Sequence, residues 1–339
     1  MLSATFSPMQ RHFDFARRTE RASAGWVLRE EAIMGTAIKV ELWADDRRMG
    51  EAAAGAVMDE MHRIDRAMSP HKAGSELSRV NRDAARGPVA LTDEMFGLLQ
   101  RAQDFARLTA GAFDITYAAV GQLYDYRNRV RPGAEALARA QACVGWQGLQ
   151  LDARDRTVRF AKEGMRIDLG GFAKGHAIDR AAELLARRGV RHAWVSAGGD
   201  SRVLGDRRGR PWSVAIRDPR RAGEVVAVLP LEDTSISTSG DYERYFDDGA
   251  ERVHHLIDPA TGLSPRGVHS VTILSADGLS CEALSKAVFV QGVQRGLALV
   301  ESLPGTDAVV VDDQGRLHVS TGLLHGLPQG AQAGPASHQ

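Results

Sequence analysis

One glycine-rich turn, Asp168-Leu-Gly-Gly-Phe-Ala-Lys-Gly-His-Ala-Ile-Asp179, constrains the fold of this chain more than any other segment. It follows an apolar run that predicts a short strand over residues 165–168, and it leads into a segment with helical spacing. Such a turn presents backbone N–H groups and a helix N-terminus to an anion. Gly170 and Gly171 allow close approach, and Lys174 can add a positive charge. An ordinary strand-to-helix connection is the alternative interpretation.

The spacing of apolar residues predicts a mixture of helices and strands. Ile38, Val40 and Leu42 alternate as in a half-buried strand, and residues 54–64 repeat with helical spacing. Thr92 is the predicted N-cap of a helix. The other predicted helices are 93–108, 134–143, 174–188 and 282–302, and the other predicted strands are 158–160, 165–168, 193–196, 212–216, 225–229, 235–237, 271–274 and 308–311. Short turns between strands favour antiparallel pairs, so the predicted fold class is α+β, a single large domain with a mixed or antiparallel sheet packed by helices.

The composition is that of an ordinary globular protein. Of 339 residues, 43% are hydrophobic and 25% are charged, and the formal net charge is +0. Because no basic run accompanies this balance, nucleic-acid binding is not indicated. No apolar run approaches the length that crosses a bilayer, so no membrane span is predicted. The two cysteines, Cys143 and Cys281, are too few for a disulfide framework.

The two ends of the chain differ from its middle. Residues 1–25 are predicted to be a poorly ordered tail, residues 26–325 the folded domain, and residues 326–339, rich in Gly, Pro and Ala, a disordered tail. The N-terminal segment lacks the apolar core of a signal peptide, and no early cysteine offers a site for a lipid anchor. The expected location is therefore cytoplasmic, which suits two free thiols.

Further motifs follow one another along the chain. The strongest are Val195-Ser-Ala-Gly-Gly-Asp200, Ser237-Thr-Ser-Gly-Asp-Tyr-Glu-Arg244 and His254-His-Leu-Ile-Asp-Pro-Ala-Thr-Gly262, and the weaker ones are Met34-Gly-Thr36, Ser75-Glu-Leu-Ser-Arg-Val-Asn81 and Gly111-Ala-Phe-Asp-Ile-Thr116. In this order and spacing, together with the glycine turn, they resemble the ApbE-like flavin transferase family, the FAD:protein FMN transferases. The resemblance runs from about Met34 to about Leu324 and implies the ApbE-like fold.

The resemblance implies FAD as the substrate and a set of residues that hold it. Lys174 and Arg180 would flank the FAD, although a solvated helix face is the alternative for both. Each of three other residues also has a purely structural interpretation. Phe113 is then an ordinary core aromatic, Asp200 caps a turn, and Tyr242 packs over the sheet. The full expected set is Met34, Ala112, Phe113, Asp114, Gly171, Lys174, Arg180, Gly198, Gly199, Asp200, Ser239, Gly240 and Tyr242.

His255 is the candidate catalytic base. It matches the histidine of the family's His-x-x-Asp-Pro-x-Thr-Gly motif, and a near-neutral imidazole can take the proton of a Ser or Thr hydroxyl. His254 competes with it but lies outside the motif register. Asp258, the second catalytic candidate, precedes Pro259 and is expected to fix the turn and to orient the histidine.

The last motif departs from the family pattern. The resemblance implies a Mg²⁺ site, whose positions here are Ala177 (by its carbonyl), Glu282, Ser285 and Lys286, where the family has a hydroxyl. An ammonium about 4 Å from Mg²⁺ would cost roughly 8 kcal/mol at an effective dielectric near 20. Either Lys286 turns away toward solvent, or its ammonium takes the place of the metal, pairing with Glu282 four residues earlier. Mg²⁺ is therefore in doubt.

The predicted function is FMN transfer from FAD to a Ser or Thr hydroxyl of an acceptor protein, with release of AMP. The acceptor implied by the resemblance is often a redox protein. Two alternatives remain open: a relative that binds FAD without transferring FMN, and an FAD pyrophosphatase in which water replaces the acceptor. The altered Lys286 favours binding alone, whereas the retained His255 and Asp200 favour catalysis.

Overall fold

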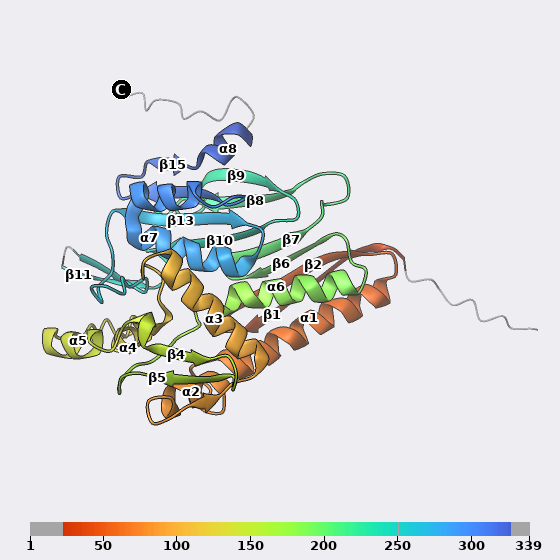
Figure 1. Ribbon diagram of the computed structural model, residues 1–339. Helices are drawn as coiled ribbons and strands as arrows, with labels where there is room; N and C mark the ends of the chain where they lie inside the picture. The colour runs from red at the N-terminus through yellow and green to blue at the C-terminus, as the bar shows by residue number, and fades with distance from the viewer. Residues whose placement is uncertain (1–22, 250, 327–339) are drawn as a thin grey trace, which may run out of the picture.

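An eight-stranded antiparallel sheet forms the centre of the molecule (Figure 1). The computed structural model describes residues 23–249 and 251–326, so almost all of both predicted tails, 1–25 and 326–339, lies outside the described residues. In spatial order the strands are β1 (Gly25–Ile33), β2 (Thr36–Ala44), β6 (Ala193–Ala197), β7 (Asp200–Leu204), β10 (Ser235–Gly240), β13 (Val268–Ser275), β14 (Asp307–Asp312) and β15 (Leu317–Val319). Every neighbouring pair is antiparallel, which confirms the predicted α+β class.

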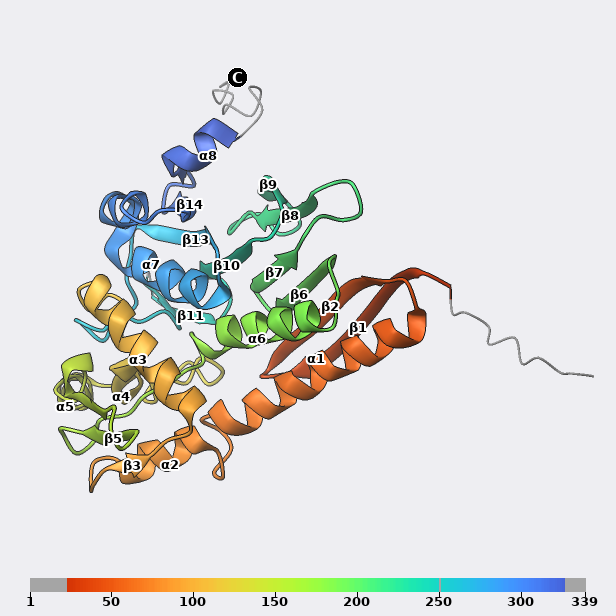
Figure 2. The ribbon, with the colours of Figure 1, turned by 45° about the vertical axis from the view of Figure 1, so that its right-hand side comes forward.

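Three helices cover one face of this sheet (Figure 2). They are α1 (Arg47–Met68), α6 (Ala173–Arg187) and α7 (Gly278–Glu301). Their apolar side chains meet the alternate residues Ile38, Val40 and Leu42 of β2, all fully buried, in one continuous core. Among the described residues, no helix combines the length and apolar character needed to span a bilayer, α7 included.

A hairpin of β8 (Trp212–Arg217) and β9 (Val225–Leu231) covers part of the opposite face. Its buried residues Trp212, Leu229 and Leu231 pack on the residues of β7, β10, β13 and β14 that point away from the helices. Trp212 also meets Trp26 of β1 edge-to-face, with ring centroids 5.5 Å apart. The sheet is therefore buried on both faces at this end.

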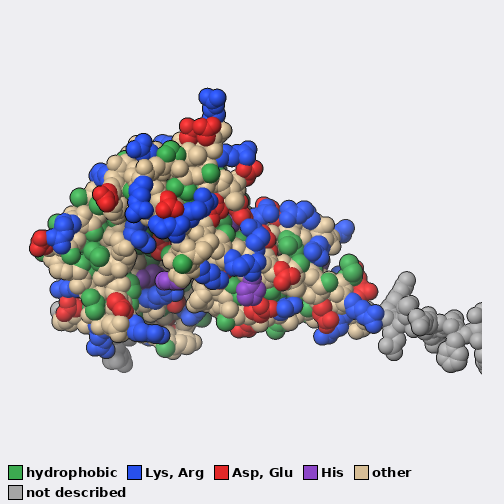
Figure 3. All heavy atoms as spheres, turned by 90° about the horizontal axis from the view of Figure 1, so that it is seen from below, with side chains coloured by type: hydrophobic (Ala, Val, Ile, Leu, Met, Phe, Trp, Pro, Cys, Tyr) green, Lys and Arg blue, Asp and Glu red, His purple; other side chains and the backbone are tan. Residues whose placement is uncertain are grey.

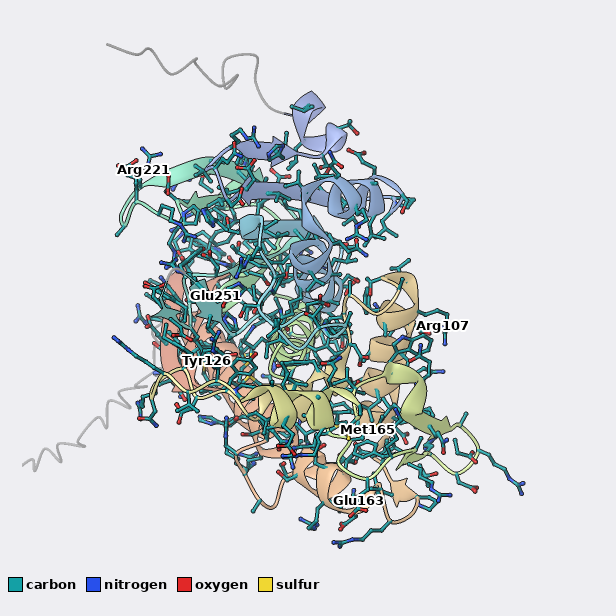
Figure 4. The ribbon with its side chains drawn as sticks, turned by 90° about the vertical axis from the view of Figure 1, so that its left-hand side faces the viewer. Arg107, Tyr126, Glu163, Met165, Arg221 and Glu251 are labelled. Carbon is teal, nitrogen blue, oxygen red and sulfur yellow. The ribbon has the colours of Figure 1, made fainter. Side chains whose placement is uncertain are left out.

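A lower layer completes the molecule, and Figure 4 shows it beneath the sheet, with Met165 inside it. It contains a three-stranded sheet, two longer helices, short helices and a small hairpin. The elements are α2 (Glu76–Asp83), β3 (Val89–Ala90), α3 (Asp93–Leu108), α4 (Ala118–Gly121), α5 (Ala134–Gln141), β4 (Leu149–Asp152), β5 (Thr157–Phe160), β11 (Tyr245–Asp248) and β12 (Glu251–His254), with short 3-10 turns at Ile115–Tyr117 and Trp146–Gly148; α8 (Thr321–Gly326) follows β15.

The predicted helices are confirmed, with boundaries that shift by a few residues. The helix over 93–108 is α3, and the Thr92 hydroxyl accepts a hydrogen bond from the backbone N–H of Met95 as predicted. The last helix begins at Gly278, four residues before the predicted start, because Asp277 caps it by accepting from the N–H of Ser280.

The predicted strand over residues 165–168 is wrong. These residues form no strand and belong to no sheet, because a side chain takes the place of a neighbouring strand. The amide of Asn81 in α2 donates to the carbonyl of Ile167 at 2.9 Å and accepts from its N–H at 2.8 Å. Asn81 thus satisfies both backbone groups of the buried Ile167 and holds the segment that leads into the glycine turn.

Replacement of Asn81 by alanine is expected to lower the free energy of unfolding by about 1–3 kcal/mol, because it leaves a buried N–H and C=O unpaired. Urea unfolding measures this change. Asn128→Ala is the matched control, since Asn128 is exposed and its amide bonds Asp125 in a surface turn; its effect should stay within about 0.5 kcal/mol. If Asn81→Ala lowered the free energy of unfolding no more than Asn128→Ala, the hydrogen bonds of Asn81 would not be needed for stability.

Candidate active site

The first turns of α6 and α7 meet and cap each other. Gly175 and Gly278 are in contact, and a Cβ at Gly175 would collide with the carbonyl oxygen of Gly278. Glu282 of α7 accepts a hydrogen bond from the N–H of Gly175 at 2.8 Å. Asp179 of α6 accepts from Gly278 at 2.7 Å and from Leu279 at 3.0 Å. Each helix therefore satisfies the free N–H groups of the other, and two helix N-termini converge on one place.

A buried ion-pair cluster lies at this junction. Lys174 Nζ contacts Asp200 Oδ2 and lies 2.5 Å from Glu282 Oε1. The side chains of Asp200 and Glu282 are 3% and 0% exposed, whereas that of Lys174 is 25% exposed, so the lysine forms the wall of the cluster nearest solvent. Burial alone would lower the pKa of Lys174, but the charges of Asp200 and Glu282 outweigh it and raise that pKa.

Hydroxyl groups from β10 and α7 continue the cluster. Ser239 and Ser285 are hydrogen-bonded at 2.8 Å through their hydroxyls, and Ser285 also donates to the carbonyl of Glu282 at 3.0 Å. Ser237 donates to Asp200 Oδ1. The structure therefore brings together Lys174, Asp200 and Ser239, three of the residues predicted to hold FAD.

Lys286 is turned into the cluster and not toward solvent. Its Nζ lies 3.1 Å from the carbonyl oxygen of Glu282 and 3.5 Å from Glu282 Oε1, and its side chain is 21% exposed. Its methylenes lie directly over Gly171, where a Cβ would collide with Lys286 Cε. The predicted pairing of Lys286 with Glu282 is confirmed. Burial, helped by the nearby charge of Lys174, lowers the pKa of Lys286.

His255 lies at the edge of this charged region. Its ring nitrogen Nδ1 is buried without a hydrogen-bond partner, and its backbone N–H donates to the carbonyl of Arg244 at 3.0 Å. Burial, followed by the positive charges of Lys286 and Arg244, lowers the pKa of His255 to about 3. The imidazole is therefore neutral near pH 7. His254, by contrast, packs edge-to-face on Phe289 in the core and bonds the carbonyl of Pro265 through Nε2 at 3.1 Å.

Asp258 fixes the turn that follows His255. Its Oδ1 accepts from the N–H of Ala260 at 2.9 Å and its Oδ2 from the hydroxyl of Thr261 at 3.1 Å. Tyr124 supports the same turn by donating to the carbonyl of Gly262 at 2.9 Å. Both carboxylate oxygens of Asp258 are thus bound within the turn, as predicted for its part in fixing the turn. His255 Nδ1 has no hydrogen-bond partner among the described residues, so the predicted catalytic role of Asp258, including its orienting of the histidine, stays a prediction.

A cavity of about 310 Å³ opens beside Asp200 and gathers a second group of predicted residues. Gly198 and Gly199, the turn between β6 and β7, line it together with Thr36, Arg217 and Glu243. Gly198 has φ +66°, and a Cβ there would lie 2.8 Å from the Thr36 hydroxyl, so glycine is required for both reasons. Met34 belongs to the adjoining β1–β2 turn.

Tyr242 packs against Gly240 next to this cavity. A Cβ at Gly240 would collide with the Tyr242 ring. Burial, followed by the charge of Glu243, raises the pKa of the Tyr242 hydroxyl, and Arg217 opposes this shift. Since Glu243 and Arg217 line the cavity, Tyr242 lies close to it.

Other predicted residues lie in different surroundings. Arg180 lies away from the Lys174 cluster, where it pairs with Glu183 at 2.6 Å and lines a separate cavity of about 690 Å³. Phe113 is 5% exposed and packs on Phe105 and Phe172 as a core aromatic.

Ala112 and Asp114, on either side of Phe113, and Ala177, the expected carbonyl ligand of Mg²⁺, also have contacts of their own within the fold. Both oxygens of Asp114 accept hydrogen bonds from inside the lower layer, from Thr116 and from the N–H of Trp146. Ala112, just before Phe113, is partly buried against the core. Ala177 lies inside α6, where the helical ladder uses its carbonyl.

Two residues that the sequence did not single out, Tyr117 and Arg220, lie near the site. The Tyr117 hydroxyl is buried, and the charges of Asp168, Arg244 and Glu282 act on its pKa, which burial raises. Arg220, from the β8–β9 loop, donates to both oxygens of Asp241, between Gly240 and Tyr242. Tyr117 directly follows the Gly111–Thr116 motif, and this position is the one local feature of the sequence that could have pointed to it. No motif in the sequence points to Arg220.

The residues at the implied Mg²⁺ position do not fit that ion. Mg²⁺ takes six oxygens at about 2.1 Å, usually including carboxylates. Glu282 is the one carboxylate of the expected set, and its oxygens are held by Lys174, Lys286 and the N–H of Gly175. Ser285 is bonded to Ser239. Within residues 23–249 and 251–326, no group of three His, Cys, Asp or Glu side chains could hold a metal.

Comparison with known proteins agrees with this arrangement. The model of the ApbE family matches residues 34–310. The FAD:protein FMN transferase of Treponema pallidum is 32% identical over 316 residues, 87% of each chain. The crystal structure of the ApbE protein of Thermotoga maritima has a TM-score of 0.81 at 32% identity and covers 89% of this chain and 99% of that one. For the flavin transferase ApbE from Vibrio cholerae, the TM-score is 0.79 at 27% identity, with the same coverage.

These matches extend over nearly the whole described domain and include the glycine turn, the β6–β7 turn and the His255 motif. The fold predicted from the resemblance is the fold of the solved relatives. On its sequence and its fold together, this chain belongs to the ApbE family.

Proposed function

We propose that this chain transfers FMN from FAD to a Ser or Thr hydroxyl of an acceptor protein and releases AMP. The observation that carries the proposal is the junction of α6 and α7, where Lys174 and Lys286 contact Glu282 and Lys286 lies over Gly171 of the glycine turn. His255 is near enough for the charge of Lys286 to lower its pKa, which keeps the imidazole neutral. A base and an anion-binding group thus lie together at two helix N-termini, as transfer of a phosphoryl group requires.

In the proposed reaction one bond to phosphorus forms and one breaks, and residues of the site take up the proton and the negative charge. The acceptor oxygen forms a bond to the phosphorus that carries riboflavin, and the bond from that phosphorus to the bridging oxygen breaks. The bridging oxygen leaves with AMP, while the hydroxyl proton passes to a ring nitrogen of His255 and from there to solvent. Lys174 and Lys286 stabilise the negative charge on the phosphates.

Bound FAD would also make His255 a better base. In the free protein its low pKa keeps it neutral but weakly basic, because Lys286 and Arg244 repel an added proton. A pyrophosphate placed against these cations offsets their charge and moves the pKa of His255 back toward neutrality. His255 therefore gains basicity when the donor is in place.

The remaining predicted residues orient the donor in this proposal. The cavity lined by Gly198 and Gly199 receives one end of FAD, and Asp200, next along the chain, and Tyr242, next to the lining residue Glu243, lie between that cavity and the pyrophosphate. Asp258 holds the His255 turn and touches no reacting atom. The acceptor is a protein with an accessible Ser or Thr, and a redox protein is the class that the family resemblance implies. Figure 3 shows Lys and Arg interspersed with Asp and Glu on the lower face, which does not favour a nucleic-acid partner.

The purified protein incubated with FAD and a flavinylation-target protein is expected to produce an acceptor whose mass has increased by that of the FMN moiety. In-gel flavin fluorescence and intact mass measure the product, and a target with its Ser or Thr replaced by alanine is the control. Free FMN and AMP with no adduct would identify a pyrophosphatase instead. FAD binding without any product from a cognate acceptor would leave the binding-only alternative.

A further inference from the structure

The charges around Glu282 already balance without a metal ion. Lys174 and Lys286 supply the positive charges, and Asp200 and Glu282 supply an equal number of negative ones. Both carboxylates are almost fully buried, so the cluster is a closed electrostatic unit in a region of low dielectric. In the free protein, a divalent cation added here would leave an uncompensated double positive charge next to two ammonium groups, which burial penalises heavily. When FAD is bound, the two ammonium groups already match the two negative charges of its pyrophosphate.

Lys286 is held in place and cannot easily withdraw. It lies on the same face of α7 as Glu282, one helical turn later, and its Nζ is held by the Glu282 carbonyl and carboxylate. Gly171 admits its methylenes because any side chain at that position would collide with them. The ammonium is thereby fixed beside the glycine turn, where the pyrophosphate of FAD is expected.

We infer that the ammonium of Lys286 takes the place of a divalent metal ion, so that this protein binds FAD and transfers FMN without Mg²⁺. The inference rests on the proposed transferase function for its catalytic part and on the geometry of Lys286, Glu282 and Gly171 for its binding part. A lysine supplies a single fixed charge and a hydrogen-bond donor, which neutralises the pyrophosphate and stabilises the AMP leaving group.

The test compares the wild type with Lys286→Thr, which restores the hydroxyl that the family resemblance implies. Wild-type transfer in excess EDTA should stay within about twofold of its rate with Mg²⁺. Lys286→Thr should be at least about 100-fold slower in EDTA and should recover when Mg²⁺ is added. Lys72→Thr is the matched control, because Lys72 pairs with Asp65 at the surface and should leave both rates unchanged.

A second measurement does not depend on transfer. Mn²⁺ binding, followed by the electron paramagnetic resonance of the free ion with and without FAD, should show no specific site in the wild type and one site in Lys286→Thr. If the threonine variant fails to fold, Lys286→Met replaces it, and its rate in EDTA should fall to the same extent.

Three results would overturn the inference. They are stoichiometric Mn²⁺ binding by the wild type, a wild-type rate that EDTA lowers by about tenfold or more and Mg²⁺ restores, and an unchanged rate for Lys286→Met in EDTA. If the wild type binds FAD but transfers nothing under any condition, the proposed function fails, and the Mn²⁺ measurement still decides whether Lys286 occupies the metal position.

Discussion

Replacing His255 by asparagine is expected to reduce the rate of FMN transfer by about 10²–10⁴-fold while FAD binding is retained. In the proposed mechanism the neutral imidazole accepts the proton of the acceptor hydroxyl, and asparagine keeps a polar side chain of similar size without a basic nitrogen. The rate comes from single-turnover transfer with saturating FAD, and the affinity from quenching of flavin fluorescence. A variant that keeps its transfer rate would remove His255 from the mechanism.

His254→Asn is the natural control for this experiment. His254 is buried against Phe289, so its replacement should lower thermal stability and leave the transfer rate of the folded protein within a few fold. If the role of His255 were purely structural, His255→Asn would also lower thermal stability and leave the transfer rate of the folded protein nearly unchanged. Loss of transfer in His255→Asn together with loss of stability in His254→Asn would separate the catalytic role from the structural one.

The pH dependence of stability gives an independent view of His255. In the unfolded chain this histidine takes up a proton below its ordinary pKa near 6.5, whereas burial and the charges of Lys286 and Arg244 delay protonation in the folded protein to about pH 3. Its contribution to stability is therefore complete above pH 6.5 and is lost as the pH falls toward 3. His255→Asn should make unfolding less sensitive to pH in this range than the wild type.

Replacing Glu282 by glutamine is expected to lower the free energy of unfolding by about 3–5 kcal/mol, because it removes the charge that Lys174 and Lys286 share. The side chain is fully buried, so solvent cannot take over this role. Urea unfolding measures the change. The control is Glu183→Gln on the outer side of α6, where Glu183 pairs with Arg180 at the surface and its loss should cost less than about 1 kcal/mol.

The same variant should respond more strongly to FAD. Without Glu282 the two ammonium groups lack part of their compensation, and a bound pyrophosphate restores it, so FAD should raise the unfolding temperature of Glu282→Gln more than that of the wild type. Equal shifts in the two proteins would show that the pyrophosphate does not contact this cluster. A variant as stable as the wild type would contradict the ion-pair description itself.

Local signals in the sequence were enough to predict most of the elements and part of the site. Alternation at Ile38, Val40 and Leu42 gave β2, and the cap at Thr92 gave α3 because the hydroxyl and its N–H partner are three residues apart. The Lys286–Glu282 pair was also predictable, since both residues lie on one helix face a single turn apart.

The failures involve partners that are far apart in the sequence. Residues 165–168 have the apolar pattern of a strand, but the group that satisfies Ile167 is the side chain of Asn81, 86 positions earlier. Whether Arg180 contacts FAD stays a prediction; its pair with Glu183 is local to α6, whereas its position 3.6 Å from Glu60 depends on the packing of α1 against α6. Short-range patterns carry no information about such contacts.

The reciprocal capping of α6 and α7 has a consequence for how a ligand as long as FAD gains entry. Each helix begins by donating N–H groups to a carboxylate of the other, and glycine contact at Gly175 and Gly278 leaves no space between them. Separating the helices would break these bonds together, so FAD is expected to enter without parting α6 from α7. The floor of the site, built by these two helix N-termini, is therefore preorganised before FAD arrives.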